Sequence, residues 1–195
     1  AKDAINVTKG VLVDTVINLT DGVASGTFYS DNTCATSITQ STISATSSAK
    51  TVYYQNNVGE SVTLTASDNA ASLTSATLNL VTGPDRLAIT GSTPFKSGAC
   101  QAFAVVTKDT SGNLVDALAD VTVNLTDGVA SGSYFSDVGC TAGITQTTVT
   151  TATQTTTVYY KDDVAESITL SAADQAMSLA TGTLAVVTGP DHLII

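Results

Sequence analysis

Short segments in which apolar and polar residues alternate run along the whole chain and predict β-strands. In residues 120–126, Val121, Val123 and Leu125 fall on one face of an extended chain and polar side chains fall on the other. Segments of the same kind lie at residues 86–89, 167–172 and 182–187. Clusters of Asp, Gly, Ser and Asn between them predict turns. Because no stretch keeps a helical apolar period over three turns, the sequence predicts an all-β protein.

The sequence repeats itself at an offset of 106 residues. The phrase LTDGVASG occurs at residues 19–26 and again at residues 125–132. Residues 1–89 align with residues 107–195 without a gap, and 43 of the 89 pairs are identical. A period of this length has the size of a domain, well above the roughly 20–50 residues of solenoid repeats. With about seven short strands rich in Thr and Val per repeat, the pattern predicts two tandem immunoglobulin-like antiparallel β-sandwiches in an elongated arrangement.

The two repeats are not equally represented in this sequence. We place the first domain at residues 1–83, the second at residues 84–188, and the first strand of a following or neighbouring domain at residues 189–195. Because Ala1 aligns with Thr107, the first repeat has no counterpart of residues 85–106, where two strands of the second are predicted. One of them, CQAFAVV at residues 100–106, alternates as a central strand does. A sandwich without it should expose unpaired backbone and part of its core.

The residues from Gly83 to Asp137 read GPDRLAITG, then VVTKDTSGNLVDALADVTVNLTDG, then SYFSD. This run resembles the bacterial Ig-like domains that occur in tandem on invasin, intimin and related surface proteins. The resemblance implies a protein that is secreted or displayed on the cell surface, with stacked domains that form stalks, adhesive rods or filaments. It also implies that enzymatic activity is rare, although a fold by itself does not identify a ligand.

The composition restricts the partners of the protein. Seven Lys and Arg residues against 17 Asp and Glu residues give a net charge of -10, which repels nucleic-acid phosphates and anionic lipids. No apolar run of about 18 residues is present, so we expect no insertion into a membrane. Aromatic residues make up only 5% of the chain, which favours thin sandwiches over a deep pocket.

Three cysteines fit the incomplete first repeat. In an extracellular sandwich we expect a disulfide between Cys100 and Cys140, the pair available in the longer repeat, worth about 3–4 kcal/mol by loop entropy. Cys34 aligns with Cys140, and the counterpart of Cys100 would lie six positions before residue 1. We therefore expect the partner of Cys34 outside this segment, the alternative being a free thiol.

Two interpretations explain the unmatched strands. In one, these residues are a stretch of a longer array of such domains. In the other, a segment from a neighbouring copy completes the first domain by strand exchange, and head-to-tail contacts build a filament. The predicted assembly strand consists of Asp191, His192, Leu193, Ile194 and Ile195, which repeat residues 85–89.

Acidic residues in predicted loops raise the hypothesis of calcium binding. Hard oxygen ligands between domains could hold Ca²⁺ and stiffen a rod. The candidate ligands are Asp85, Asp109, Asp116, Asp162 and Asp163. The alternative is that these residues are solvated turn positions, since no spaced D-x-D-x-D-G loop is present. No other cofactor is indicated.

The sequence offers no catalytic constellation. Its one histidine, His192, aligns with Arg86, which favours a solvent-facing position, and the common hydrolase and nucleotide-binding motifs are absent. We therefore predict a non-enzymatic, extracellular structural protein whose partners are copies of itself or further repeats of the same chain. The alternative is an adhesin that recognises a carbohydrate or a host protein through the loops of its sandwiches.

Overall fold

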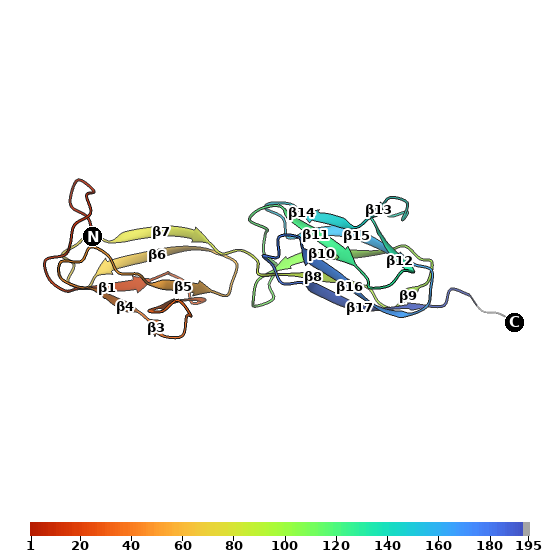
Figure 1. Cartoon of the computed structure of the whole chain (residues 1–195), viewed down its shortest axis with the longest axis horizontal. Coiled ribbons are helices and arrows are strands. Elements are labelled where there is room, and N and C mark those ends of the chain that lie inside the picture. Colours follow the sequence, from red (N-terminus) through yellow and green to blue (C-terminus); the bar gives the residue numbers. More distant parts are fainter. Residues whose placement is uncertain (193–195) are drawn as a thin grey trace. The chain divides into compact units, whose positions relative to one another are not determined.

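The computed structural model describes residues 1–192. The chain divides into two compact units, Ala1–Thr82 and Gly83–Ile195, called unit 1 and unit 2 below (Figure 1). Every element of the described residues is a β-strand, and nearly all strand pairs are antiparallel. The predicted all-β fold class is therefore confirmed.

Unit 1 contains seven strands in two sheets. One sheet has the order β4-β1-β6-β7 and the other the order β3-β2-β5. The strands are β1 (Thr15–Thr20), β2 (Gly26–Tyr29), β3 (Ser37–Ile38), β4 (Gln40–Ile43), β5 (Tyr53–Asn56), β6 (Ser61–Asp68) and β7 (Ala76–Val81).

Unit 2 repeats these seven strands in the same order and adds three at its start. The added strands are β8 (Arg86–Gly91), β9 (Phe95–Lys96) and β10 (Gln101–Lys108). The repeated ones are β11 (Val121–Thr126), β12 (Gly132–Phe135), β13 (Gly143–Ile144), β14 (Gln146–Val149), β15 (Thr155–Asp162), β16 (Ser167–Asp174) and β17 (Gly182–Gly189). Its sheets have the orders β14-β11-β16-β17-β9 and β13-β12-β15-β10-β8.

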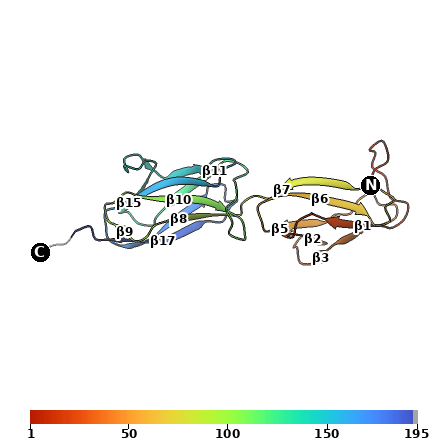
Figure 2. The same ribbon diagram turned by 180° about the vertical axis from the view of Figure 1, so that it is seen from behind.

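The strand β10 lies between β15 and β8, as the alternation of residues 100–106 predicts (Figure 2). Phe103 and Val105 face the core and are almost fully buried. Across the core they meet residues of the other sheet such as Val123 and Leu170, which have no exposed surface. Unit 2 is thus a sandwich whose two sheets bury apolar side chains between them.

The buried cores of the two units differ, although their shared strands have closely similar sequences. The hydrophobic cluster of unit 2 draws residues from both sheets, including β8 and β10. In unit 1 the buried hydrophobic residues are Val11, Phe28 and Val62. Since β8, β9 and β10 are what the described part of unit 1 lacks, their side chains account for the closed core of unit 2.

Candidate functional site

Unit 2 contains the disulfide that the sequence predicts. Cys100, just before β10, is bonded to Cys140, in the loop after β12, with their Cα atoms 5.8 Å apart. The bond ties the central strand β10 to the loop that follows β12 in the same sheet. Unit 1 has the free Cys34 at the position of Cys140.

The loop around Cys34 has the conformation of its disulfide-bonded counterpart. Cys34 has a φ of 53° and Cys140 a φ of 50°, a left-handed conformation that is uncommon outside glycine. In both loops the carboxylate of the Asp two residues after the strand ends, Asp31 after β2 and Asp137 after β12, accepts several hydrogen bonds. Asp31 accepts them from Thr33, Ala35 and Thr36, and they hold the pKa of Asp31 well below its usual range. The Cys34 loop therefore keeps this shape without a disulfide.

The edge of unit 1 next to β5 is open. In unit 2 the corresponding strand β15 is eight residues long, and β10 pairs with it from Gln101↔Tyr160 to Val106↔Thr155. In unit 1 only four residues, Tyr53–Asn56, form a strand. Residues 49–52 match the first half of β15 but have no strand structure. A strand persists only where a neighbour satisfies its backbone, so the missing partner accounts for the shorter β5.

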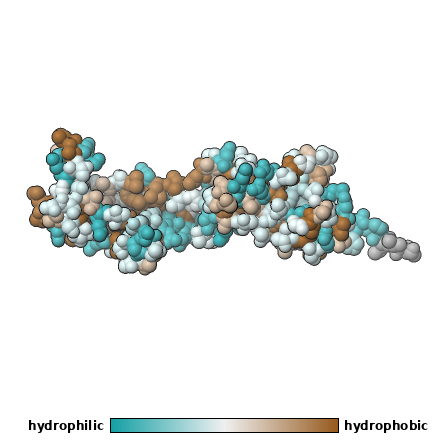
Figure 3. Space-filling view, viewed as in Figure 1, coloured by the Kyte–Doolittle hydropathy of each residue, from teal (hydrophilic) through white to brown (hydrophobic). Residues whose placement is uncertain are grey.

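Exposed apolar side chains accompany this open edge. Leu12 is 95% exposed and Leu78 63% exposed. Figure 3 shows hydrophobic surface along β7, where Leu78 and the exposed Val81 lie. Large contiguous apolar patches on a protein surface mark interaction sites. We refer to the unpaired edge of β5 together with Leu12, Leu73 and Leu78 as the open face of unit 1.

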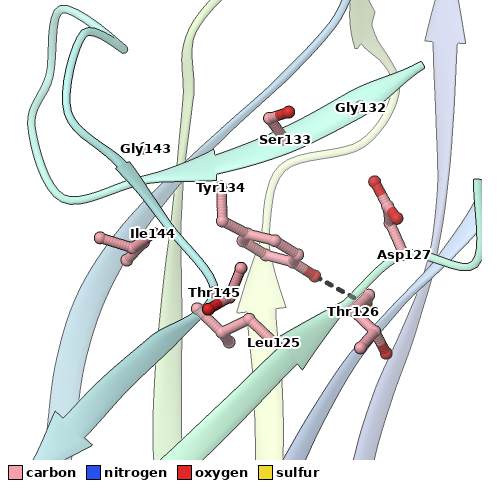
Figure 4. Close-up of a pocket in the computed structure, with 9 residues that line it drawn as sticks. All are labelled: Leu125, Thr126, Asp127, Gly132, Ser133, Tyr134, Gly143, Ile144 and Thr145. Atoms are coloured by element: carbon pink, nitrogen blue, oxygen red, sulfur yellow. Dashed lines mark hydrogen bonds between the residues drawn. The ribbon is translucent and has the colours of Figure 1, made fainter. Parts of the chain in front are cut away.

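A hollow of about 410 Å³ lies on unit 2 beside β11, β12 and β13 (Figure 4). Its lining consists of Leu125, Thr126, Asp127, Gly132, Ser133, Tyr134, Gly143, Ile144 and Thr145. The Tyr134 hydroxyl donates a hydrogen bond of 3.1 Å to the carbonyl oxygen of Thr126, drawn as a dashed line in the figure. The lining contains one carboxylate, Asp127, so it does not offer the paired acid and base that hydrolysis of a glycosidic bond uses.

The titratable groups near this hollow form hydrogen bonds within the fold. The Tyr160 hydroxyl donates to the Asp127 carboxylate over 2.8 Å, and Tyr54 makes the equivalent bond to Asp21 over 2.9 Å in unit 1. Burial, followed by the bond to Asp21, raises the pKa of Tyr54 to about 12. Burial likewise raises the pKa of Tyr134, so the phenols stay neutral near pH 7.

The five candidate calcium ligands have different local partners. Asp85 accepts a hydrogen bond from Thr110, Asp116 from Gln154, and Asp163 forms an ion pair with Lys161. Asp109 and Asp162 are buried. Within residues 1–192, no three His, Cys, Asp or Glu side chains come together in a way that could hold a metal ion. Calcium binding stays a prediction, and the geometry gives it no assembled ligand set.

The position of Asp162 carries a different residue, with different hydrogen bonds, in unit 1. The Oδ1 atom of Asp162 accepts a hydrogen bond from Val164, while its buried Oδ2 atom has no partner among the described residues. Unit 1 has Asn56 at this position, and its amide donates to Glu60 over 2.9 Å. Asp162 thus lacks the donor that its counterpart uses.

The predicted assembly strand lies only partly within the described residues. Asp191 and His192 are exposed, lie outside the strands and contact each other. Leu193, Ile194 and Ile195 lie outside the described residues.

Sequence reasoning did not single out Gly182 of unit 2 or Ala76 of unit 1, which occupy the same position of the repeat. A Cβ atom on Gly182 would lie 2.5 Å from the Leu87 carbonyl oxygen, so β8 runs directly over this glycine. Unit 1 has Ala76 at the matching position. The signal was available, because a glycine inside a strand often marks the close approach of another backbone.

Comparisons with known proteins concern the fold alone. No protein-family model and no curated protein sequence matches this chain. Among solved structures, the D00-D0 domain of intimin is similar at 16% identity and a TM-score of 0.48, covering 91% of this chain and 86% of that one. The Yersinia pseudotuberculosis adhesin InvE is similar at 16% identity and a TM-score of 0.42, covering 96% and 52%.

A glycosyl hydrolase family 2 member from Bacteroides cellulosilyticus is similar at 9% identity and a TM-score of 0.44. The match covers 89% of this chain but only 21% of the hydrolase. At these TM-scores none of the three structures assigns an activity to this chain. No helix long and apolar enough to cross a membrane occurs in the described part of the chain.

Proposed function

We propose that this chain is a non-enzymatic structural module of an extracellular stalk or fibre, in which immunoglobulin-like units follow one another. The observation that carries the proposal is the open face of unit 1. Unit 2 shows that the seven shared strands close a core when strands of the β8 to β10 kind are added. A module with one closed and one open unit is suited to joining a further unit of the same repeat.

A repeated segment suggests how the units join. Residues 187–195 repeat residues 81–89, and seven of these nine positions are identical. In unit 2 the earlier copy begins the sandwich, since β8 starts at Arg86. We propose that Asp191–Ile195 serve as the first strand of an adjoining unit, either in the same polypeptide or in a neighbouring copy by head-to-tail strand exchange.

Two further features support an extracellular location. The Cys100–Cys140 disulfide is of a kind that forms and persists in oxidising compartments. The net charge of -10 keeps such a protein soluble and apart from other acidic molecules. Neither feature requires an enzymatic role.

Electron microscopy of the native material, combined with its intact mass, tests this proposal. We expect rods or fibres built from repeating units. An intact mass well above 19.7 kDa would indicate a longer covalent array, whereas 19.7 kDa within a polymer would indicate strand exchange. Dispersed particles with no repeat, at the concentration of the native assembly, would contradict the structural role.

The hollow of Figure 4 favours a second candidate, an adhesin that binds a glycan or a host surface molecule. Its lining combines the hydroxyl of Ser133 and the carboxylate of Asp127 with the apolar side chain of Ile144, a mixture that suits a sugar ring. A glycan array with the wild-type chain and a Ser133→Trp variant tests it. Glycan binding that Ser133→Trp abolishes would support the adhesin role, and binding unaffected by it would place the site elsewhere.

A further inference from the structure

Core positions of unit 1 are less buried than their counterparts in unit 2. Leu64 is only partly buried, whereas its counterpart Leu170 is fully buried in unit 2. Val52 and Val158 differ in the same way. The sequences of the shared strands are closely similar, so the exposure of these residues reflects what lies against them. In unit 2 the cover includes the side chains of β8 and β10.

Backbone hydrogen bonds in unit 2 show where the covering strand is anchored. The N–H of Leu87 donates to the carbonyl oxygen of Ala180, and the N–H of Ala180 donates to that of Asp85, both over 2.9 Å. The N–H of Asp85 donates to Lys108 over 2.9 Å. Unit 1 retains both anchor positions, with Thr74 at that of Ala180 and Lys2 at that of Lys108. Thr74 has no backbone partner among the described residues. A strand that enters unit 1 therefore finds the same hydrogen-bonding groups.

The apolar end of the open face matches the start of the covering segment. The backbone of Gly83 packs on Leu118, since a Cβ atom there would lie 2.7 Å from the Leu118 side chain. Leu12 is the counterpart of Leu118, and it is 95% exposed where Leu118 is 56% exposed. Beside it, Leu73 is exposed, whereas its counterpart Leu179 packs against the core of unit 2.

We propose that the open face of unit 1 receives a β8–β10-type segment of a further unit of the same repeat, and that a cysteine in this segment then bonds to Cys34. The proposal rests on the proposed function and names the partner that completes unit 1. The segment begins with Gly-Pro-Asp, carries Leu and Ile two residues apart, and continues through a cysteine into an alternating apolar strand. Residues 83–108 of this chain are an example.

The position of the cysteine in the incoming segment is inferred from the geometry of unit 2. Cys140 bonds to Cys100 at the start of β10, and β10 occupies the edge that is open beside β5. Cys34 has the same backbone conformation as Cys140. An incoming β10-type strand that pairs with β5 therefore brings its cysteine to Cys34.

The bond forms by thiol–disulfide exchange with a small disulfide such as oxidised glutathione. The Cys34 thiolate attacks one glutathione sulfur, and one reduced glutathione leaves. The thiolate of the incoming cysteine then attacks the Cys34 sulfur and releases the second glutathione. The two protein thiols lose two protons and two electrons, and the glutathione disulfide is reduced to two thiols.

Ala76, in the same strand as Leu78, opposes a placement of the incoming strand identical to that of β8 in unit 2. Ala76 stands where unit 2 has Gly182, and its Cβ atom lies where the β8 backbone passes in unit 2. The incoming strand must therefore shift outward at this point, which weakens its packing. Ala76→Gly removes the obstruction and should therefore tighten binding of the strand. Non-specific hydrophobic association would not be strengthened by this change.

The experiment adds a synthetic peptide of residues 83–108 to the 195-residue chain in the presence of oxidised glutathione. We expect an adduct whose mass is that of chain plus peptide less two hydrogens, with the bond mapped to Cys34 and the peptide cysteine. The variant Cys34→Ser should still bind the peptide without the bond. In the chain, Ala76→Gly should lower the peptide Kd about fivefold or more, as expected when a clash worth about 1 kcal/mol or more is relieved.

A peptide carrying Phe103→Asp and Val105→Asp is the matched control, because these side chains face the core of unit 2. It should neither bind nor form the bond. Equal adduct formation by this control, or no binding by the wild-type peptide, would overturn the inference. Fibres in the microscope without peptide binding would contradict this inference but not the proposed function. Peptide binding without any assembly would contradict the proposed function but not this inference.

Discussion

The carbonyl oxygen of Leu87 lies directly over Gly182, so that a Cβ atom on this glycine would lie 2.5 Å from it. Real Cβ atoms do not approach a backbone oxygen this closely. The contact places β8 against the start of β17 and helps to close the sandwich of unit 2. The matching residue in unit 1, Ala76, is exposed.

Gly182→Ala should destabilise unit 2. The added methyl group must displace the backbone of Leu87 and Ala88, and overpacking of this kind costs about 1–3 kcal/mol. Chemical denaturation followed by tyrosine fluorescence measures the change. Gly143→Ala is the control, because the nearest atom to its added Cβ lies 4.0 Å away. Equal stability losses in both variants would show that the close approach of β8 is not the cause.

Asp162→Asn should stabilise unit 2 by about 1 kcal/mol, the typical net value of a hydrogen bond. The amide supplies a donor where the buried Oδ2 atom has no partner, as Asn56 does toward Glu60 in unit 1. The reverse change, Asn56→Asp, should destabilise unit 1 because it removes that donor. Differential scanning calorimetry at pH 7 measures both. A loss of stability in Asp162→Asn would mean that the carboxylate has a partner that the neutral amide cannot replace.

Removal of the Cys100–Cys140 disulfide should cost unit 2 about 4 kcal/mol, from the loop entropy of its 40-residue separation. Cys100→Ser with Cys140→Ser, compared with the wild type in denaturant, measures this. Cys34→Ser should leave the stability of the isolated chain nearly unchanged, since Cys34 is a free cysteine there. A similar loss in Cys34→Ser would contradict the assignment of the bond.

The stability of unit 2 should fall at acidic pH, in part through Asp137. The hydrogen bond from the backbone of Ala142, together with those from Thr141, lowers the pKa of Asp137 below its usual 3.8, and desolvation opposes this shift without cancelling it. A carboxylate with a lowered pKa in the folded state stabilises above its unfolded pKa, and this contribution is lost as the pH falls through the folded one. Thermal unfolding followed from about pH 6 down to about pH 2 measures the fall. Asp137→Asn should be less stable near pH 6 and should lose less on acidification, and parallel curves for both proteins would refute the role of Asp137.

Much of the fold could be predicted because the strand pattern is local. The alternation of Val121, Val123 and Leu125 gave β11, and the alternation after Cys100 gave the central strand β10. The 106-residue offset showed which strands unit 1 lacks. The inward face of β10 could not be predicted, because it depends on which sheet packs against it. Phe103 and Val105 point inward, and Val106 and Thr107 are also buried.

The candidate site was predictable in outline but not in its particulars. The absence of a counterpart to β8 and β10 indicated an open face, and the odd Cys34 agreed with it. The close approaches of Gly83 to Leu118 and of Leu87 to Gly182 in unit 2 could not be read from the sequence, because they depend on how β8 crosses the opposite sheet. The five candidate calcium ligands were grouped because all were predicted to lie in loops. A position in a loop does not by itself bring carboxylates close together in space.

The sequence by itself determined the strands, the repeat, the charge and the pairing of Cys100 with Cys140, because these follow from local periodicity and from the alignment of one half with the other. The tertiary structure decided which side chains are covered. Leu64 and Leu170 have similar neighbours along the chain, in VTLTA and ITLSA, but only Leu170 is fully buried. Burial depends on strands distant in sequence, and β8 and β10 provide that cover in unit 2 alone.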